Sequence, residues 1–127
     1  MIDDEEDITT YMQLVLEDHG YAVVTTNDAR RALALLEEAS PDVVLLDLLM
    51  PRVTGASLYS RICNSPRLGG TPIVVMSALD LRDELPRLLA TDHARVEPAG
   101  FVEKPVDAQR VLEILAGIVG RTEAHPR

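Results

Sequence analysis

Short runs of apolar, largely β-branched residues alternate along the chain with longer stretches in which apolar residues recur at helical spacing. The helical spacing predicts helices over residues 7–19, 29–39, 56–65, 81–92 and 107–119. The apolar runs predict strands over residues 21–26, 43–46, 73–76 and 100–103, with a shorter run at residues 1–2. Strands that are apolar throughout are typical of a parallel sheet covered by helices on both faces. The pattern therefore predicts an α/β fold with a parallel sheet and right-handed crossovers.

Local signals mark where several of these elements begin and end. Gly20 follows the first helical stretch as a stop signal, and Asn27 and Asp28 are placed to cap the second. Pro86 falls inside the stretch over residues 81–92, which makes the start of that helix uncertain. With no internal linker or repeat, we expect a single domain over residues 1–120 and a polar tail over residues 121–127.

Composition narrows the possible classes of protein. The 127 residues include 12 Lys and Arg against 21 Asp and Glu, a formal net charge of −9, which argues against direct nucleic-acid binding. The longest apolar runs are far too short to span a bilayer, and no secretory signal pattern begins the chain. The single cysteine, Cys63, fits a reducing compartment. We therefore expect a cytoplasmic protein without a membrane segment.

Chemically active side chains follow four of the predicted strands. Asp3 and Asp4 come after the first apolar run, Asp47 after residues 43–46, Ser77 after residues 73–76 and Lys104 after residues 100–103. In open parallel sheets, ligands bind outside the carboxyl ends of the strands. We therefore expect one crevice to hold three carboxylates, a hydroxyl and an ammonium group.

This group of side chains suits phosphoryl transfer. Clustered carboxylates repel one another unless a proton or a cation relieves the repulsion, and hard oxygen ligands favour Mg²⁺. Lys104 can neutralise a phosphoryl oxygen, Ser77 can donate a hydrogen bond, and Asp47 can act as a nucleophile that forms an aspartyl phosphate. Taken singly, each residue has an ordinary alternative as a solvated acid, a turn serine or a surface lysine. The prediction depends on their shared position at strand ends.

The same residues resemble the receiver domain of bacterial response regulators of two-component systems, over nearly the whole chain. The motifs that carry the resemblance are Ile2-Asp3-Asp4-Glu5, Asp47-Leu48-Leu49-Met50-Pro51 followed by Gly55, Ser77-Ala78, and Lys104-Pro105. The resemblance implies a doubly wound, five-stranded parallel sheet of flavodoxin-like order 2-1-3-4-5. It also implies a phosphoacceptor regulatory domain rather than an enzyme that turns over a substrate.

In the roles that the resemblance implies, Asp47 takes a phosphoryl group from a histidine kinase or a phosphotransfer protein. Asp4, Asp47 and the backbone carbonyl of Leu49 bind Mg²⁺ directly, and Asp3 acts largely through water. Ser77 then moves to contact the phosphoryl group, which changes a surface that binds an output protein. We expect the resulting switch to select one of two packings.

Three further positions follow from the resemblance. Phe101 matches the aromatic switch position, and the bond between Lys104 and Pro105 is often cis in this family. Leu49 and Leu79 flank the phosphoryl site, where apolar side chains should hinder attack by water and give a long-lived phosphoryl state. Purely local packing of the two leucines is the alternative.

The chain departs from the family in its first strand, which is truncated, because only Met1 and Ile2 precede the acidic pair. Neighbouring strands are then left partly unpaired, which leaves three explanations: a cut or misassigned start of the chain, coverage of the exposed edges by another subunit, or a weakened fold. We favour the first for the origin of the sequence, and for its behaviour we expect a homodimer or strand exchange through that edge. The α-amino group is expected near Asp3 and Asp4, where it would perturb the metal site. The stretch between Ser77 and Lys104 also looks several residues longer than usual.

Two alternatives remain open from the residues. A phosphohydrolase of the haloacid dehalogenase type also uses a strand-end aspartate, Mg²⁺ and a lysine. That class has a second acid two residues after the nucleophile, where this chain has Leu49. A receiver-like binding module that no longer signals is the other. The three histidines lack ligand spacing, which argues against a zinc site.

Overall fold

A three-stranded parallel sheet forms the centre of the molecule. The computed structural model describes residues 1–48, 55–77 and 98–123, and within these the sheet has the order β1-β2-β3. The strands are β1 (Val44–Asp47), β2 (Ile73–Ser77) and β3 (Gly100–Glu103), and both pairs are parallel. The register places Asp47 opposite Met76 and Ser77 opposite Glu103, so the carboxyl ends of the strands lie at one edge.

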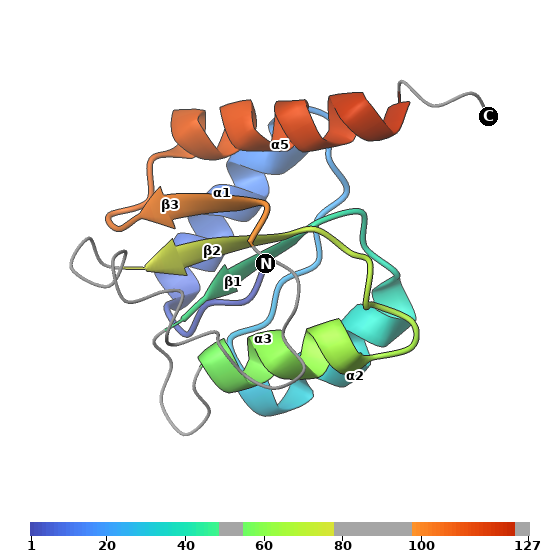
Figure 1. Cartoon of the computed structure of the whole chain (residues 1–127). Helices are drawn as coiled ribbons and strands as arrows, with labels where there is room; N and C mark the ends of the chain where they lie inside the picture. The colour runs from blue at the N-terminus through green and yellow to red at the C-terminus, as the bar shows by residue number, and fades with distance from the viewer. Residues whose placement is uncertain (49–54, 78–97, 124–127) are drawn as a thin grey trace.

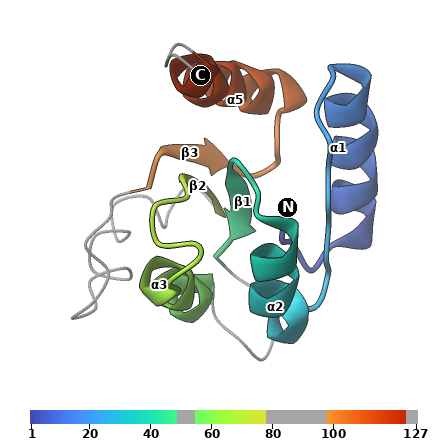
Figure 2. The same ribbon diagram turned by 90° about the vertical axis from the view of Figure 1, so that its right-hand side faces the viewer.

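Helices cover both faces of the sheet. Figures 1 and 2 show α1 (Glu6–Asp18) and α5 (Ala108–Glu123) on one face, and α2 (Ala29–Ala39) and α3 (Gly55–Asn64) on the other. Successive side chains of β1 point to opposite faces, so Val44 and Leu46 pack with α2 and α3 while Leu45 packs with α1 and α5. All four residues of β1 are buried, which explains why its sequence lacks polar alternation. The predicted α/β class is confirmed.

Local sequence signals set the ends of the first two helices. Gly20 has a φ of +92°, a left-handed conformation that glycine adopts without strain, and it follows the last turn of α1. The side chain of Asp28 accepts a hydrogen bond from the backbone N–H of Arg30 at 2.9 Å, so Asp28 caps α2 as predicted.

Helix α5 is longer than predicted. It continues to Glu123 rather than ending at residue 119, so the expected tail over residues 121–127 begins within the helix. A single glycine such as Gly120 costs a helix only about 1 kcal/mol, and no proline follows until Pro126. The predicted helix over residues 81–92 lies outside the described residues.

The expected strand over residues 21–26 does not form. Thr26 makes an isolated parallel bridge to Ile2, and Ile2 makes a second one to Leu46 of β1, but residues 21–25 lie outside any strand. A strand forms only where a neighbouring strand pairs with it along its length. The segment over residues 1–3 lies between residues 24–26 and β1, and it reaches only the end of the expected strand over residues 21–26. The short first strand thus leaves its neighbour without a ladder, as its sequence predicted.

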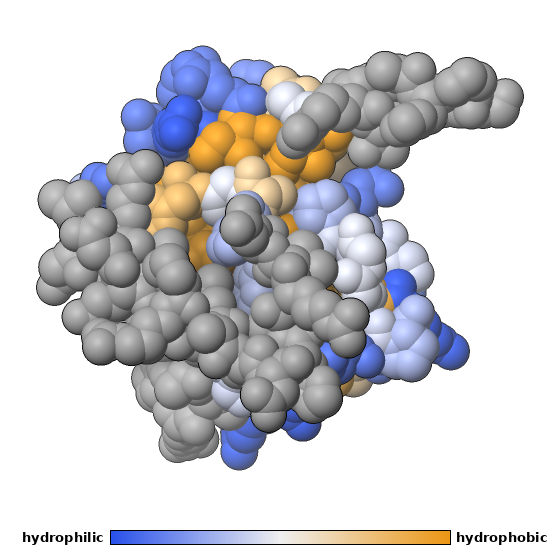
Figure 3. Space-filling model, viewed as in Figure 1, coloured by the Kyte–Doolittle hydropathy of each residue, from blue (hydrophilic) through white to orange (hydrophobic). Residues whose placement is uncertain are grey.

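Polar and apolar residues are unevenly distributed over the surface. On the face shown in Figure 3, hydrophobic residues gather next to α5 and hydrophilic residues lie around them. Among the described helices, none has the length and apolar character required to cross a bilayer.

Candidate functional site

The carboxyl edge of the sheet brings together the acids that the sequence singled out. Asp47 is the last residue of β1, and Asp3 and Asp4 follow Ile2, whose backbone N–H donates to the Leu45 carbonyl at 2.7 Å. Carboxylate oxygens of Asp3, Asp4 and Asp47 all lie within 4.8 Å of one another. The predicted gathering of three carboxylates at this edge is therefore present.

Lys104 reaches into this cluster from the end of β3. Its Nζ lies 3.0 Å from Asp3 Oδ2, 3.1 Å from Asp47 Oδ2 and 3.2 Å from Glu5 Oε1. The Asp3 and Asp47 side chains are 0% and 1% exposed, whereas that of Lys104 is 20% exposed. One ammonium group thus partly neutralises two buried carboxylates and one exposed carboxylate, that of Glu5.

The surroundings of Lys104 keep it charged. Burial by itself would lower the pKa of the Lys104 amine, because it removes water from the charged form. The close contact with Asp3 and the charge of Asp47 outweigh burial and raise this pKa well above its ordinary value. Lys104 is therefore a permanent positive charge at the site throughout the physiological pH range.

The three acids differ in their exposure. Asp3 and Asp47 are buried, whereas Asp4 is exposed and lies at the mouth of the site. Asp3 Oδ1 accepts a hydrogen bond from the Glu5 backbone N–H at 3.0 Å, while Asp3 Oδ2 has only its ion pair with Lys104 and no well-aligned hydrogen bond among the described residues. A buried carboxylate oxygen in this condition retains capacity for a further cationic ligand.

Ser77 adds a hydroxyl at the end of β2. Its backbone carbonyl accepts a hydrogen bond from the Lys104 backbone N–H at 2.8 Å, which fixes Lys104 beside the end of β2. Its side chain is 1% exposed, and its Oγ has no hydrogen-bond partner within the described part of the chain. An unpaired buried hydroxyl costs free energy, so it marks a place where a polar ligand would be favoured.

The residues present fit a hard divalent cation such as Mg²⁺. Three carboxylates within 4.8 Å give more negative charge than Lys104 neutralises, and Asp4 leaves the site open toward solvent for water or a phosphoryl oxygen. The backbone carbonyl of Leu49, another predicted ligand, lies outside the described residues, as does Leu79.

Asn27 supports the site in a way that the sequence did not reveal. Its Nδ2 donates to the Asp3 backbone carbonyl at 2.8 Å and to Thr9 Oγ1 at 3.0 Å, so it links the acidic segment to α1. The sequence suggested Asn27 only as a helix cap, because its position beside Asp28 gave no sign of a contact with residues 18 and 24 positions away. The direct ion pair of Glu5 with Lys104 was likewise not predicted.

Three remaining expectations, on the Lys104–Pro105 bond, Phe101 and the Met1 amine, can be compared with the structure. The bond between Lys104 and Pro105 is cis, as the resemblance implied. Phe101 lies on β3 opposite Val75 and is half-buried against the core beside α2 and α3. The Met1 amine, expected near Asp3 and Asp4, donates to the Val24 carbonyl at 2.8 Å and forms no ion pair with these acids among the described residues.

The chain is similar to known proteins over most of its length. The model described as the response regulator receiver domain matches residues 1–116. The chain is 28% identical over 123 residues to the alkaline phosphatase synthesis transcriptional regulatory protein PhoP of Bacillus subtilis, covering 97% of this chain and 48% of that protein. It is 33% identical over 122 residues to the sensory/regulatory protein RpfC of Xanthomonas campestris, covering 94% of this chain and 16% of that protein.

A solved structure has a similar fold. The crystal structure of the receiver domain of NtrX from Brucella abortus superimposes with a TM-score of 0.78 at 26% sequence identity, covering 94% of this chain and 95% of that chain. The chain spans about half the length of the PhoP regulator and a smaller share of RpfC. The similarity to these two proteins is therefore confined to one part of each.

Proposed function

Because the chain belongs to the response regulator receiver domain family, we propose that Asp47 is its phosphoacceptor and that Mg²⁺ is its cofactor. Receiver domains of two-component systems are regulatory phosphoacceptors rather than enzymes that turn over a substrate. The observation that carries the assignment to Asp47 is its position at the end of β1, buried, with Lys104 Nζ 3.1 Å from its Oδ2.

The proposed step transfers a phosphoryl group from a phosphohistidine to Asp47. A carboxylate oxygen of Asp47 forms the new O–P bond while the N–P bond of the donor breaks. The donor imidazole keeps the electron pair of that bond and takes up a proton. Lys104 holds a positive charge beside the developing phosphoryl oxygens, and Ser77 Oγ is a free donor for one of them.

Asp3, Asp4 and Asp47 are the described residues that would hold the metal ion, with Asp3 acting largely through water. Mg²⁺ bound there would neutralise charge between the carboxylates and the phosphoryl oxygens. Two residues of the chain support this site: Asn27 positions the Asp3 backbone, and Lys104 offsets the negative charge of the buried acids.

The switch is proposed to run from Ser77 to Phe101. In this proposal, Ser77 Oγ turns to donate to the phosphoryl group, and Phe101 moves inward to fill the space that the serine segment leaves. Half-burial of Phe101 on the neighbouring strand β3 supports this route, since the ring already lies at the boundary between core and solvent. In this proposal, the charge added by phosphorylation at the edge of the sheet selects between two arrangements of Ser77 and Phe101.

A histidine kinase or a phosphotransfer protein is the proposed phosphoryl donor, and an output protein the proposed receiver of the signal. Similarity to a protein named as sensory/regulatory supports a partner of this kind. The net charge of −9 supports a protein rather than a nucleic acid as the direct partner.

We also propose that the fold follows the full five-stranded order 2-1-3-4-5, with the domain over residues 1–120. The two bridges of Ile2 support this order, because they place residue 2 between Thr26 and Leu46 of β1. In the proposed order, the segment over residues 1–3 lies next to β1, and the segment over residues 21–26 lies outside it at the edge of the sheet.

Phosphorylation by a small donor tests the assignment directly. The protein is incubated with acetyl phosphate and MgCl₂, and the phosphorylated fraction is measured by phosphate-affinity electrophoresis and intact mass. We expect a gain of one phosphoryl group that needs Mg²⁺ and disappears in Asp47→Asn. The matched control is Asp42→Asn, which changes an exposed aspartate five residues earlier and should leave labelling unchanged.

Full labelling of Asp47→Asn would contradict the proposal. Beryllofluoride separates a working switch from a binding module that no longer signals. We expect it to tighten Mg²⁺ binding to the unmodified protein but not to Asp47→Asn.

A further inference from the structure

Glu5 lies at the edge of the site and shares Lys104 with the buried acids. Its Oε1 accepts a hydrogen bond from Lys104 Nζ at 3.2 Å, and Lys104 is the only partner of this carboxylate among the described residues. Lys104 Nζ donates a second hydrogen bond to Asp47 Oδ2 at 3.1 Å, while its contact with Asp3 is an ion pair at 3.0 Å. An ammonium group has three donors, so these three carboxylates leave it little capacity for a further acceptor.

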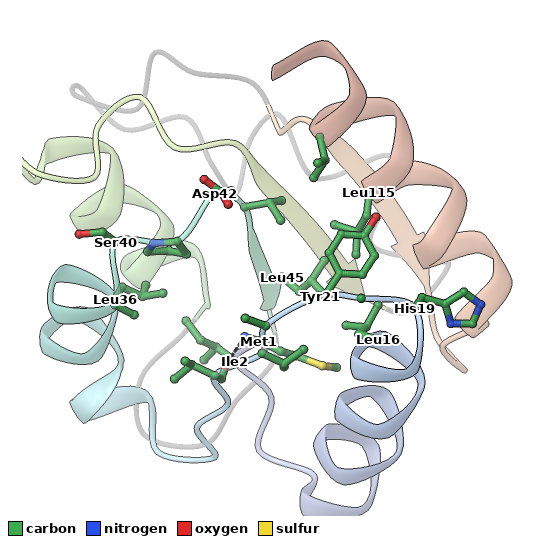
Figure 4. Close-up of a pocket in the computed structure, with 18 of the residues that line it drawn as sticks. Met1, Ile2, Leu16, His19, Tyr21, Leu36, Ser40, Asp42, Leu45 and Leu115 are labelled. Carbon is green, nitrogen blue, oxygen red and sulfur yellow. Dashed lines mark hydrogen bonds between the residues drawn. The ribbon is translucent and has the colours of Figure 1, made fainter. Parts of the chain in front are cut away.

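The carboxylates around Lys104 differ in how firmly they are held. Asp3 is fully buried, and it follows Met1 and Ile2, which pack with the helices on opposite faces of the sheet. Figure 4 shows both of these side chains among those of the two helical layers. The Glu5 side chain, in contrast, is 56% exposed. Water can therefore replace Lys104 at Glu5 at little cost, whereas a buried carboxylate that loses its cation stays uncompensated.

A phosphoryl group on Asp47 would bring new negatively charged oxygens beside Lys104. Stabilisation of these oxygens depends on positively charged donors close to them. Among the three contacts of Lys104, the one with Glu5 is the easiest to give up, because its carboxylate returns to water. Glu5 is also the N-cap residue of α1 and makes no capping hydrogen bond with its side chain. The positive end of the helix dipole would favour the released carboxylate.

We propose that Glu5 competes with the phosphoryl group for Lys104, a proposal that rests on Asp47 as the phosphoacceptor. The hydrogen bond from Lys104 Nζ to Glu5 Oε1 breaks, and one from Lys104 Nζ to a phosphoryl oxygen forms. No covalent bond changes in this exchange. Glu5 is a positioning residue, because it acts through Lys104 and does not touch the phosphorus atom. Its effect is to weaken binding of the phosphoryl group and to slow its transfer to the resting protein.

Beryllofluoride, a mimic of the phosphoryl group, tests the competition without a transfer step. Its affinity for the intact chain is measured by calorimetry at saturating Mg²⁺, so that differences in metal binding do not contribute. Loss of an exposed ion pair changes an equilibrium constant by up to about fivefold. We therefore expect Glu5→Gln to bind beryllofluoride about three- to fivefold more tightly than the unmodified protein. Glu5→Ala, which removes the side-chain acceptor altogether, should bind at least as tightly as Glu5→Gln.

Glu6→Gln is the matched control. Glu6 is the next residue, is also exposed, and makes no ion pair with Lys104 among the described residues. This variant should bind beryllofluoride as the unmodified protein does. Salt gives a second readout, because screening weakens exposed ion pairs. The ratio of affinities between Glu5→Gln and the unmodified protein should therefore fall toward one as the NaCl concentration is raised.

Equal or weaker binding of beryllofluoride by Glu5→Gln would overturn the proposal, since Glu5 would then only hold Lys104 in place. An equal gain in Glu6→Gln would assign the effect to overall charge, and a gain that NaCl does not reduce would exclude an exposed ion pair as its cause. Each of these results would overturn the competition while leaving the Asp47 assignment intact. Absence of beryllofluoride binding and of labelling in the unmodified protein would instead overturn the Asp47 assignment, and the competition at Lys104 with it.

Discussion

Lys104 is the residue on which the charge balance of the site depends. Its Nζ lies within 3.2 Å of three carboxylate oxygens, two of them from fully buried side chains. Removing one partner of a buried ion pair leaves an uncompensated charge, which costs more than the pair itself contributes.

We therefore expect Lys104→Met to lower the free energy of unfolding by roughly 3 kcal/mol in the absence of divalent cations. Millimolar Mg²⁺ should recover much of this loss, because the cation replaces the missing positive charge. Urea unfolding followed by circular dichroism with and without MgCl₂ measures both effects. A loss that Mg²⁺ does not reduce would point to lost packing of the lysine stem instead.

The α-amino group of Met1 gives a pH dependence of stability in protein that carries it free. Burial lowers its pKa from 8.0 to about 6. An amine with a lower pKa in the folded state binds fewer protons there than in the unfolded state, so stability rises with pH between about 6 and 8.

The rise should amount to roughly 2 kcal/mol across that window. N-terminal acetylation removes the charge while keeping an N–H that can donate to Val24, so the acetylated protein should lack this rise. The difference between the two unfolding curves at pH 6 and pH 8 cancels the contributions of the histidines. Parallel pH profiles would show that the amine is not desolvated.

At the scale of elements, the acidic segment is held in place by a loop that has no regular structure of its own. Asn27 joins the Asp3 backbone to Thr9 of α1, and Thr26 and Asp3 share a backbone hydrogen bond of 3.3 Å. These contacts replace the strand ladder that residues 21–26 would otherwise supply.

Asn27→Ala should lower the free energy of unfolding by about 1 kcal/mol, since it removes two part-buried hydrogen bonds made by an exposed residue. It should also weaken Mg²⁺ binding, because Asp3 loses its positioning contact. Asn64→Ala is the matched control, as Asn64 makes one long contact of 3.5 Å at the exposed end of α3. An unchanged Mg²⁺ affinity in Asn27→Ala would restrict this residue to a structural role.

At the scale of the whole molecule, the excess of negative charge is concentrated where the cation is proposed to bind. The chain carries a net charge of −9, and the first seven residues include five acids. A cation that binds the folded state alone stabilises it in proportion to the logarithm of its concentration.

We expect Mg²⁺ at one hundred times its Kd to raise the free energy of unfolding by about 2.7 kcal/mol. Asp4→Asn should remove most of this gain, since Asp4 belongs to the cluster but is exposed and makes no ion pair with Lys104 among the described residues. Asp7→Asn, an equal change of charge outside the cluster, should retain the gain. Equal losses in both variants would indicate general screening of charge rather than a defined site.

How far prediction from sequence succeeded depended on the kind of residue. Apolar runs identified β1 and β2 because strands buried on both faces lack polar alternation, and the short run over residues 100–103 identified the less buried β3. Gly20 and Asp28 marked helix ends through their own local chemistry. The positions of Asp47, Ser77 and Lys104 at strand ends followed in turn, because parallel strands place their carboxyl ends at one edge.

Contacts between distant segments were decided only in three dimensions. The bond from Asn27 to Asp3 joins residues 24 positions apart, and the Lys104 ion pair with Glu5 joins residues 99 apart, so no local pattern encodes either. The missing strand over residues 21–26 had the right composition for a strand but lacked a partner along its length. Local propensity is a property of a segment, whereas a strand ladder and a charge cluster depend on what lies beside that segment in the folded chain.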